Sequence, residues 1–480
     1  MKKILALFLI GFIVSCSDDF LDKEPSVNSR VEVETAEQLE YILNSSTYLT
    51  DEYVNSFCTD NTGIPVDLFD EIGNSWSPFT LEQYTWSTSI SQNGDETWAA
   101  YYETIWRANL IINLISENKV TGDEQLKLAV KTEAHYRRAS NLFDLALIYA
   151  LYPSASNADE LGVVLRTETN YGESQSRASL KETFDQIESD LEQALENPIE
   201  DIIPNRGTLP VIEAFAAKFY LYMGDYDKAE QHANEALSLY SEMVNYATAI
   251  STITAGNGLV YPSTVNVSPY SPVALEVFKD RYIFNTLIND SWNTSPSQEL
   301  LDLYDTNDLR MRFMVKDYFI RNQATVNPWY GYVNIYIGQA VNGESVPEMY
   351  LIRAEAKARR GDLSGAMADV EMVRMNRFTP ENYTPLSVPA NDKATVELII
   401  DERRREFPFT RRWMDLKRLN NDPLTDPIIL TRQFYEVGEN GSVGTQVQTQ
   451  TLEPNDRRYA RPIGVDVITN SNGATQQNEY

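Results

Sequence analysis

Tryptophan, tyrosine and asparagine residues gather in two stretches of the sequence that are rich in turn-forming Gly, Asn, Ser and Pro. An aromatic side chain offers a flat apolar face, and an amide offers both a donor and an acceptor of hydrogen bonds. Together they suit a ring-shaped ligand with an apolar face and a polar rim, such as a sugar. The candidate ligand-binding residues are Trp76, Trp86, Trp292, Trp329, Tyr330 and Tyr332, with Asn327 and Asn334 as polar partners. The opposing interpretation is that these rings pack inside the protein, because tryptophan is highly buried on average.

Residues able to support covalent or metal chemistry are few and isolated. His135 and His232 have no cysteine or acidic residue at metal-ligand spacing, so we predict no metal site and no cofactor. The sequence has no phosphate-binding glycine loop, nucleophile elbow or zinc motif. Cys58 has no histidine near it in a recognisable motif, and we expect a small buried side chain there. We therefore expect a binding protein rather than an enzyme; release of product from a polysaccharide would favour a hydrolase instead.

The segment 209–240 is predicted to form two helices joined by a tight turn. Pro210 suits the first helical position, and the apolar residues after it recur at steps of three and four. Gly224 is expected to end the first helix, since glycine readily adopts the left-handed conformation of a helix C-terminus. In the second helix the small residues Ala229 and Ala236 share one face, which allows close packing. The segment resembles one tetratricopeptide repeat.

The same pattern returns in residues 347–378, where Gly361-Asp362 occupies the position of Gly224-Asp225. One helix pair cannot bury its apolar face alone, so such units stack on one another. The two copies lie far apart in the sequence, and the predicted scaffold therefore has long insertions between stacked pairs. Two unrelated helical hairpins are the alternative, because Gly-Asp turns are common.

Other helices follow from apolar residues at helical spacing and are expected over residues 98–115, 126–152, 179–197 and 395–420. Ser179 and Glu182 have the spacing of a capping box at a helix start. Residues 241–346 lack helical spacing over much of their length, and long ordered loops of this kind are usually functional. The tail, 421–480, is expected to hold short strands with a turn in its glycine-rich part. The predicted fold is mainly α: a tetratricopeptide-like helical repeat scaffold with long irregular loop insertions and a few short strands.

The N-terminus predicts export. Lys2 and Lys3 precede an apolar run, Ile4–Val14, which is too short for a permanent membrane-spanning helix. This arrangement is typical of a secretory signal peptide. Residues 13–16 also resemble a bacterial lipobox, so we predict acyl chains, palmitate among them, on Cys16 that anchor the protein to a membrane. The formal net charge of −30 makes nucleic acid or an anionic membrane surface a poor partner.

This interpretation divides the chain into parts. They are a signal peptide (1–15), a lipid-anchored tether (16–38) and a single domain (39–480). Within the domain we expect an N-terminal helical part (39–240), a loop-rich ligand-binding insertion (241–346) and a C-terminal part (347–480). The most basic segment, Glu402–Arg418, places opposite and like charges one helical turn apart. A solvated or internally salt-bridged helix explains this segment better than an anion-binding site does.

Several short motifs occur in the order found in the SusD/RagB family of Bacteroidetes outer-membrane lipoproteins, and the resemblance covers nearly the whole mature chain. The N-terminal motifs are Cys16-x-Asp18-Asp19-Phe20-Leu21-Asp22, Trp98-x-x-x-Tyr102-x-x-Ile105-x-x-Ala108-Asn109, Glu133-Ala134-x-x-Arg137-Arg138-Ala139 and Asp190-Leu191-x-x-Ala194. The C-terminal motifs are Tyr350–Ala356, Glu402–Glu406 and Arg412-Trp413-x-Asp415-Leu416-Lys417-Arg418. The family usually has a glycine in the link between the last two motifs, whereas the link here, Phe407–Arg411, has none.

The resemblance implies a SusD-like fold and a nutrient-binding lipoprotein of the cell outer membrane that faces outward. Such proteins cap a SusC-like TonB-dependent transporter and bind an oligosaccharide, or in some members a peptide, for import. The expected function is therefore capture of glycans and their delivery to the transporter, without catalytic residues. A peptide-capturing member and a pure protein-interaction scaffold are the alternatives. Failure of every small ligand, together with tight co-purification of the transporter, would favour the scaffold.

Overall fold

The computed structural model describes residues 33–44, 52–72, 77–89, 95–170, 172, 174–200, 206–254, 259–262, 279–283, 285–286, 295–317, 329–332, 341–437 and 443–480. Several predictions concern residues outside this part of the chain: the signal peptide, the lipid anchor at Cys16, and the candidate ligand residues Trp76, Trp292, Asn327 and Asn334.

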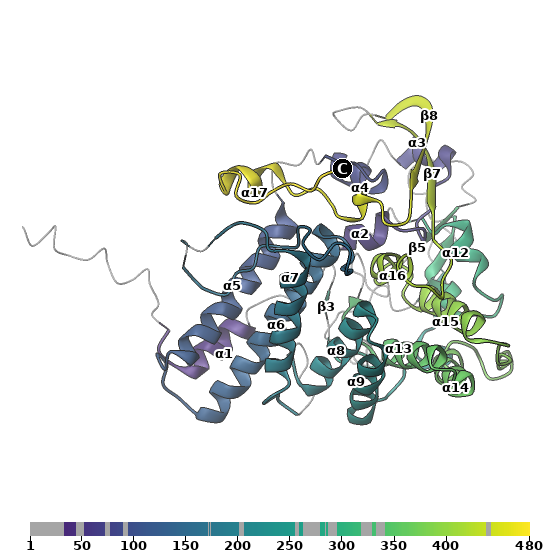
Figure 1. Cartoon of the computed structure of the whole chain (residues 1–480). Coiled ribbons are helices and arrows are strands. Elements are labelled where there is room, and N and C mark those ends of the chain that lie inside the picture. The colour runs from purple at the N-terminus through teal and green to yellow at the C-terminus, as the bar shows by residue number, and fades with distance from the viewer. Residues whose placement is uncertain are drawn as a thin grey trace, which may run out of the picture.

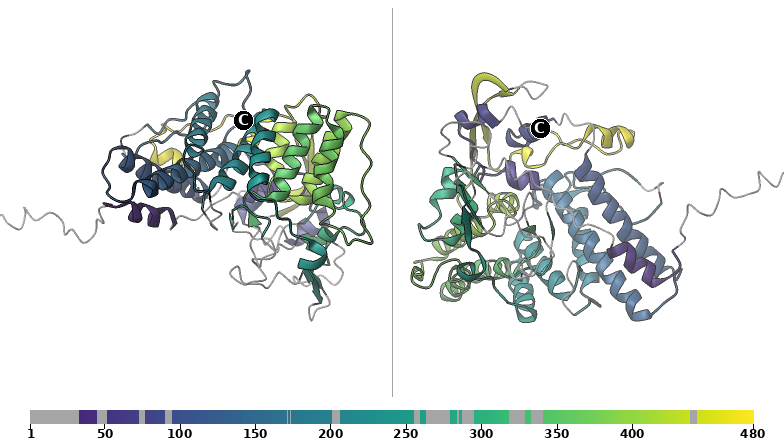
Figure 2. Two further views of the ribbon diagram at one scale, coloured as in Figure 1. Left: turned by 90° about the horizontal axis from the view of Figure 1, so that it is seen from below. Right: turned by 180° about the vertical axis from the view of Figure 1, so that it is seen from behind.

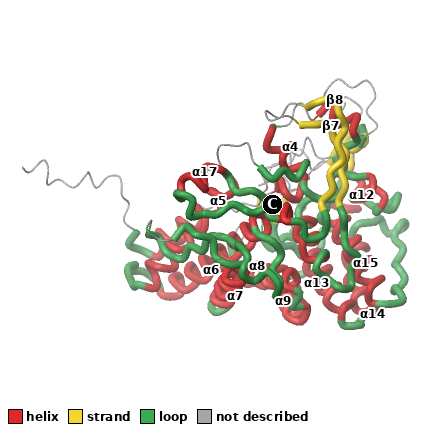
Figure 3. The backbone as a smooth tube through the Cα atoms, turned by 45° about the horizontal axis from the view of Figure 1, so that its top comes forward, coloured by secondary structure: helices red, strands yellow, loops and turns green. Residues whose placement is uncertain are grey.

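A row of helices packed side by side forms the frame of the molecule (Figures 1 and 3). Its members are α5 (Glu96–Ser116), α6 (Glu124–Tyr149), α7 (Leu180–Ala194), α8 (Leu209–Met223), α9 (Tyr226–Leu239), α13 (Val346–Arg359), α14 (Leu363–Arg374) and α15 (Asp392–Glu406). Successive helices in this row pack against one another, and α9 packs against α13 although the intervening loops separate them in the sequence. Figure 2 shows from behind that α5 and α6 run alongside each other. The prediction of a mainly helical scaffold with long insertions and few short strands is confirmed.

The two helix pairs predicted from their Gly-Asp turns are built in the same way. Gly224 follows α8 with a φ of 77°, and Gly361 follows α13 with a φ of 85°, both in the left-handed region. Each following aspartate then caps the next helix: Asp225 accepts from the Lys228 N–H at 3.1 Å, and Asp362 from the Gly365 N–H at 2.9 Å. The chain therefore reverses sharply at both sites, which lets each pair close on itself and stack on the other.

The start of α7 agrees with the sequence prediction, whereas the helix predicted over residues 395–420 does not. The capping box at the start of α7 is confirmed, since the Ser179 side chain accepts from the Glu182 N–H and the Glu182 side chain accepts from the Ser179 N–H. The continuous helix expected over 395–420 is wrong, because α15 ends at Glu406 and α16 (Arg412–Leu419) begins after a turn. Pro408 lies in that turn and cannot donate a main-chain hydrogen bond, while the side chains of Phe407 and Phe409 are buried.

Shorter elements surround the row of helices. Near the N-terminus they are α1 (Ala36–Asn44), α2 (Glu52–Phe57), α3 (Val66–Ile72) and α4 (Pro78–Tyr84). Between α9 and α13 lie α10 (Tyr246–Ala249), α12 (Gln298–Asp302) and the 3-10 helix η6 (Leu309–Phe313), and near the C-terminus lie the 3-10 helix η8 (Arg457–Tyr459) and α17 (Val465–Asn470).

The strands pair antiparallel, two at a time. The pairs are β1 (Thr252–Thr254) with β2 (Val260–Pro262), β3 (Asn285–Thr286) with β6 (Val341–Asn342), β4 (Met314–Lys316) with β5 (Tyr330–Tyr332), and β7 (Leu430–Val437) with β8 (Val443–Leu452). The last pair forms the hairpin expected around the glycine-rich part of the tail. One large apolar core holds side chains from Val54 to Ile463, so the N-terminal and C-terminal helices are buried against a shared interior.

Candidate functional site

Of the aromatic residues in the second predicted loop region, Trp329, Tyr330 and Tyr332 lie on the β4–β5 hairpin. Tyr332 pairs with Met314 and Tyr330 with Lys316, so the two tyrosines share one face of the hairpin. Both pack against a small apolar cluster around Phe409, while Trp329 packs against a different cluster around Phe434. All three rings remain partly exposed. The structure therefore places Tyr330 and Tyr332 on one face of the hairpin and Trp329 against a separate cluster, and each of the three residues is partly exposed.

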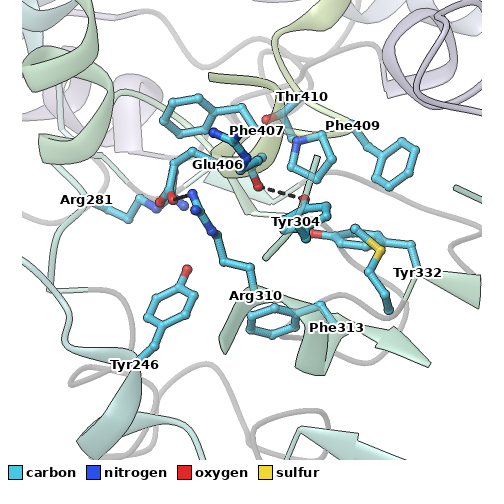
Figure 4. Close-up of a pocket in the computed structure, with 13 residues that line it drawn as sticks. Tyr246, Arg281, Tyr304, Arg310, Phe313, Tyr332, Glu406, Phe407, Phe409 and Thr410 are labelled. Carbon is cyan, nitrogen blue, oxygen red and sulfur yellow. Dashed lines mark hydrogen bonds and ion pairs between the residues drawn. The ribbon is translucent and has the colours of Figure 1, made fainter. Parts of the chain in front are cut away.

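A cavity lies under the tyrosine face of this hairpin (Figure 4). Its walls include Tyr246, Tyr304, Phe313, Tyr332 and Phe409 together with the guanidinium of Arg310. The ring centroids of Tyr332 and Phe409 are 4.6 Å apart, so the link without glycine directly supports the hairpin. The cavity measures about 60 Å³, which leaves room for water rather than for a sugar ring. A ligand would therefore lie on the outer side of the rings, and the cavity belongs to their support.

The charged side chains around Arg310, at the base of the cavity under the hairpin, form ion pairs with one another. Arg310 donates to Asp308 Oδ2 at 2.7 Å, to Glu402 Oε1 at 2.8 Å and to Glu406 Oε2 at 3.0 Å. Burial alone would raise the pKa of Glu402, but nearby arginines led by Arg310 outweigh it and lower the pKa to about 2. Glu402 is therefore ionised at neutral pH and compensated from within the protein, so this floor offers no free charge to an ionic ligand.

The basic segment Glu402–Arg418 continues this pattern of internal ion pairs. Arg418 Nη1 lies 2.7 Å from Glu355 Oε1, and its Nε lies 2.8 Å from Asp415 Oδ1. Arg403 Nε lies 3.1 Å from Asp415 Oδ2. These side chains are buried. The internal salt bridges predicted for this segment are present, and the pairs lie inside the protein instead of in solvent.

Trp86, from the first predicted loop region, is enclosed in the protein. Its side chain is only 3% exposed, and its indole N–H donates to the Cys58 carbonyl at 2.9 Å. Arg432 of β7 covers the ring, with its guanidinium 4.5 Å from the ring centroid. This contact joins residues far apart in the sequence, and it leaves no free face for stacking. The same packing surrounds Cys58, which is buried as predicted and donates to the Gln83 carbonyl at 3.3 Å.

The two histidines take part in hydrogen bonds within the helical frame. His135 Nδ1 lies 2.8 Å from Asp190 Oδ1, and His232 Nδ1 lies 2.6 Å from Glu213 Oε2. Within the described ranges, no group of three or more His, Cys, Asp or Glu side chains is placed to hold a metal ion. None of the helices in those ranges combines the length and apolar composition needed to cross a bilayer.

A second hollow was not predicted from the sequence. It lies beside α5, measures about 200 Å³ and is lined by Trp98, Tyr102, Trp106, Asn109, Val164, Arg166, Glu168, Gln175, Val467 and Thr475. The helical spacing of Trp98, Tyr102 and Trp106 predicts that the three share one face of the helix. The sequence does not reveal that the chain leaves the last of these rings uncovered.

Comparison with known families identifies the class of protein. Residues 19–221 match a family model described as "Starch-binding associating with outer membrane", and residues 346–480 match the model of the SusD family. Together the two matches cover well over half of the chain, in the order expected from the sequence motifs. The chain belongs to the SusD/RagB family. No curated protein sequence matches the chain significantly.

Solved structures share the whole fold. A SusD superfamily protein from Bacteroides thetaiotaomicron aligns with a TM-score of 0.66 at 19% identity, over 93% of this chain and 100% of that one. A putative sugar-binding protein from Bacteroides vulgatus aligns with a TM-score of 0.63 at 19% identity, over 94% and 99%. A laminarin-binding SusD-like protein aligns with a TM-score of 0.57 at 16% identity, over 93% and 99%. At these identities the likeness concerns the fold alone.

Proposed function

We propose that this protein captures oligosaccharides at the outer surface of the outer membrane and delivers them to a SusC-like TonB-dependent transporter. The observation that carries the proposal is the β4–β5 hairpin, where the partly exposed Tyr330 and Tyr332 pack over a charge-compensated base and the partly exposed Trp329 adjoins them in the chain. Neutral rings on such a base favour a neutral ligand with apolar faces. The names of two solved relatives, one sugar-binding and one laminarin-binding, favour a carbohydrate among such ligands.

Delivery requires that the protein stay at the membrane. We propose that Cys16 carries the acyl chains and that residues 16–38 form the tether between the lipid and the folded domain. A Cys16→Ala variant should then appear in the soluble fraction after export, while the parent protein stays with the outer membrane. Mass spectrometry of the N-terminal peptide should show the acyl groups on Cys16, and an unmodified cysteine there would contradict the anchor.

The sharpest test of ligand capture is a Trp329→Ala variant of the mature protein. We expect binding to laminarin or starch to weaken at least about tenfold, equivalent to roughly 1.4 kcal/mol, because an aromatic anchor at the centre of a site carries much of the binding energy. Affinity electrophoresis and calorimetry measure this change. Tyr41→Ala is the matched control, since Tyr41 is an aromatic residue 75% exposed on a distant helix and should bind as the parent does.

The same experiment separates the alternatives. Peptides tested in parallel would bind in place of glycans if the protein were a peptide-capturing member of the family. Equal affinity in the parent and in Trp329→Ala would remove the hairpin from the site. Tight co-purification with the transporter and no small-molecule binding would leave a protein-interaction scaffold. Release of reducing sugar from the glycans by the parent protein would contradict a purely binding role.

A further inference from the structure

The hollow beside α5 is a built feature rather than a gap between loops. Three polar side chains on one face of α5 hold the extended segment 164–168 by its main chain. Tyr102 Oη donates to the Val164 carbonyl at 2.8 Å, and Asn109 Nδ2 donates to the Arg166 carbonyl at 3.0 Å. Asn113 Nδ2 donates to the Thr167 carbonyl at 3.4 Å and also to the side-chain Oε2 of Glu168 at 3.1 Å. The segment is therefore fixed along the helix, and so are the side chains it carries into the hollow.

The buried network behind the helix fixes this arrangement further. Arg138 Nη1 donates to Asn109 Oδ1 at 2.8 Å, which leaves the amide nitrogen of Asn109 to point at the segment. Asp190 in turn accepts from Arg138 Nη2 at 2.6 Å. From the C-terminal side, Thr475 Oγ1 donates to the Gln175 carbonyl at 2.9 Å. Asn109 is itself fully buried, so the hollow has a rigid polar floor.

The groups that face the open side of the hollow have unused binding capacity. Trp106 is 41% exposed, although it lies on the same helix as the buried Trp98. In the described part of the chain, the Trp106 indole and the Arg166 guanidinium have no hydrogen-bond or ion-pair partner. Gln175 adds a side-chain amide to the same wall. The lining of the hollow thus includes an aromatic ring, a guanidinium and a side-chain amide.

We propose that this hollow is a second saccharide site, which takes a single pyranose ring with equatorial hydroxyl groups. Such a ring has flat C–H faces for Trp106 and a hydroxyl rim for Arg166, Glu168 and Gln175. Arg166 and Glu168 carry opposite charges, so the site favours a neutral ligand over an ion. The volume of about 200 Å³ lies below the roughly 300–1,000 Å³ of sites for drug-sized ligands, which limits it to one ring of a longer chain.

This site is independent of the β4–β5 hairpin. Helix α5 lies at one end of the row of helices and β5 at the other (Figure 1), so one bound ring cannot contact both. A long glycan could engage both sites at once and gain avidity without any new contact. The second site would then retain a polysaccharide at the cell surface while the hairpin holds the portion to be delivered.

The test uses the mature protein labelled with 5-fluorotryptophan, whose seven tryptophans give separate fluorine signals. Trp106→Phe assigns the Trp106 signal. Titration with laminarihexaose should shift this signal saturably, with a dissociation constant near the millimolar range expected for one ring on one aromatic face. The same shift should persist in Trp329→Ala, which separates this site from the hairpin. The absence of a saturable shift up to about 10 mM ligand would overturn the proposal.

A pair of arginine variants tests the wall of the hollow. Arg166→Ala should lower the affinity measured from the Trp106 signal at least about threefold, since it removes hydrogen bonds to the sugar rim. Arg107→Ala is the matched control, because Arg107 lies next to Trp106 on α5 but forms an ion pair with Glu103 at 2.6 Å. Equal affinities in both variants would overturn the assignment of the hollow. A Trp106 shift without any Trp329 shift would support this site and contradict the hairpin site.

Discussion

The junction of α13, α15 and α16 and the β4–β5 hairpin contact each other through Phe409, yet they distribute polar and apolar groups in opposite ways. In the junction, Glu355 and Glu402 are 0% exposed and Arg403 is 1% exposed. In the hairpin, aromatic rings remain partly exposed. Buried ion pairs depend strongly on geometry and are costly to break, whereas replacing a partly exposed ring removes less buried apolar surface than replacing a fully buried one. The junction therefore fixes the frame, and the hairpin is free to vary with the ligand.

Among the variants that test this difference between the junction and the hairpin, Arg418→Ala should have the largest effect on stability. The variant leaves the buried carboxylates of Glu355 and Asp415 without their shared guanidinium. We expect the free energy of unfolding to fall by about 3 kcal/mol or more, as for other broken buried pairs. Urea denaturation followed by circular dichroism measures this loss.

The control for this prediction is Arg457→Ala, which removes a pair between Arg457 and Glu160 whose side chains are 45% and 38% exposed. Surface pairs contribute only about 0–1 kcal/mol. If Arg418→Ala lost no more stability than Arg457→Ala, the buried ion pairs of the junction would not stabilise the fold more than an exposed pair does.

Acid should weaken the junction before it affects the hairpin. Glu402 has a pKa of about 2 in the folded protein, against about 4.3 in an unfolded chain. Because the folded pKa is the lower one, this carboxylate stabilises the fold above about pH 5, and its contribution is lost as the pH falls towards 2. The contribution amounts to about 3 kcal/mol. The difference in free energy of unfolding between the parent and Glu402→Gln should therefore become smaller as the pH falls from about 5 towards 2.

Unfolding curves measured from pH 6 to pH 2.5 test this expectation. Glu235→Gln changes an exposed carboxylate on α9 and should run parallel to the parent throughout. A constant gap between the parent and Glu402→Gln would show that Glu402 does not titrate as its ion pairs imply.

The frame of the molecule could be predicted from the sequence because its signals are local. Gly224 and Gly361 mark helix ends through the conformation that glycine permits, and Ser179 marks a helix start through a hydrogen bond three residues away. Trp329, Tyr330 and Tyr332 were also singled out from the sequence, because a run of rings among turn residues is unusual, and their role in binding stays a prediction. Each of these features depends on residues that are neighbours in the chain.

Other features depend on contacts that the sequence does not display. Trp86 is a loop tryptophan like Trp329, but Arg432 from the C-terminal hairpin covers it. The partners of Arg418 lie 63 residues away at Glu355 and three residues away at Asp415. Trp106 shares a helical face with Trp98, and only the path of the segment after α6 decides that it stays exposed. Burial of a particular ring or charge is thus set by the tertiary structure.

Lys417 is an exception within the junction and offers a smaller test. In the described ranges its ammonium group donates only to the main-chain carbonyls of Leu147 and Ala150, at 2.9 Å and 2.5 Å. Burial lowers the pKa of Lys417 to about 7, whereas the unfolded chain retains about 10.4. Between these values the unfolded state binds more protons, so stability should rise as the pH increases from 7 to about 9.5. The slope is at most about 1.4 kcal/mol per pH unit.

Replacing Lys417 with methionine should flatten this rise, whatever it does to stability at pH 7. Lys181→Met is the control, because Lys181 is 66% exposed and should leave the slope unchanged. Parallel slopes for the parent and Lys417→Met would mean that this lysine keeps an ordinary affinity for its proton.

The smallest expected effect concerns the hydroxyl group of Tyr332. Burial raises the pKa of Tyr332 above its usual value, so the hydroxyl stays protonated and can donate a hydrogen bond at any physiological pH. No partner for it occurs among the described residues, and Tyr332→Phe should therefore change the free energy of unfolding by less than about 0.5 kcal/mol. If the hydroxyl contacts a glycan, the affinity for laminarin should fall about two- to tenfold, since one hydrogen bond contributes roughly 0.5–1.5 kcal/mol. Calorimetry and thermal unfolding on one preparation measure both quantities. Loss of stability without loss of affinity would place Tyr332 with the frame rather than with the binding surface.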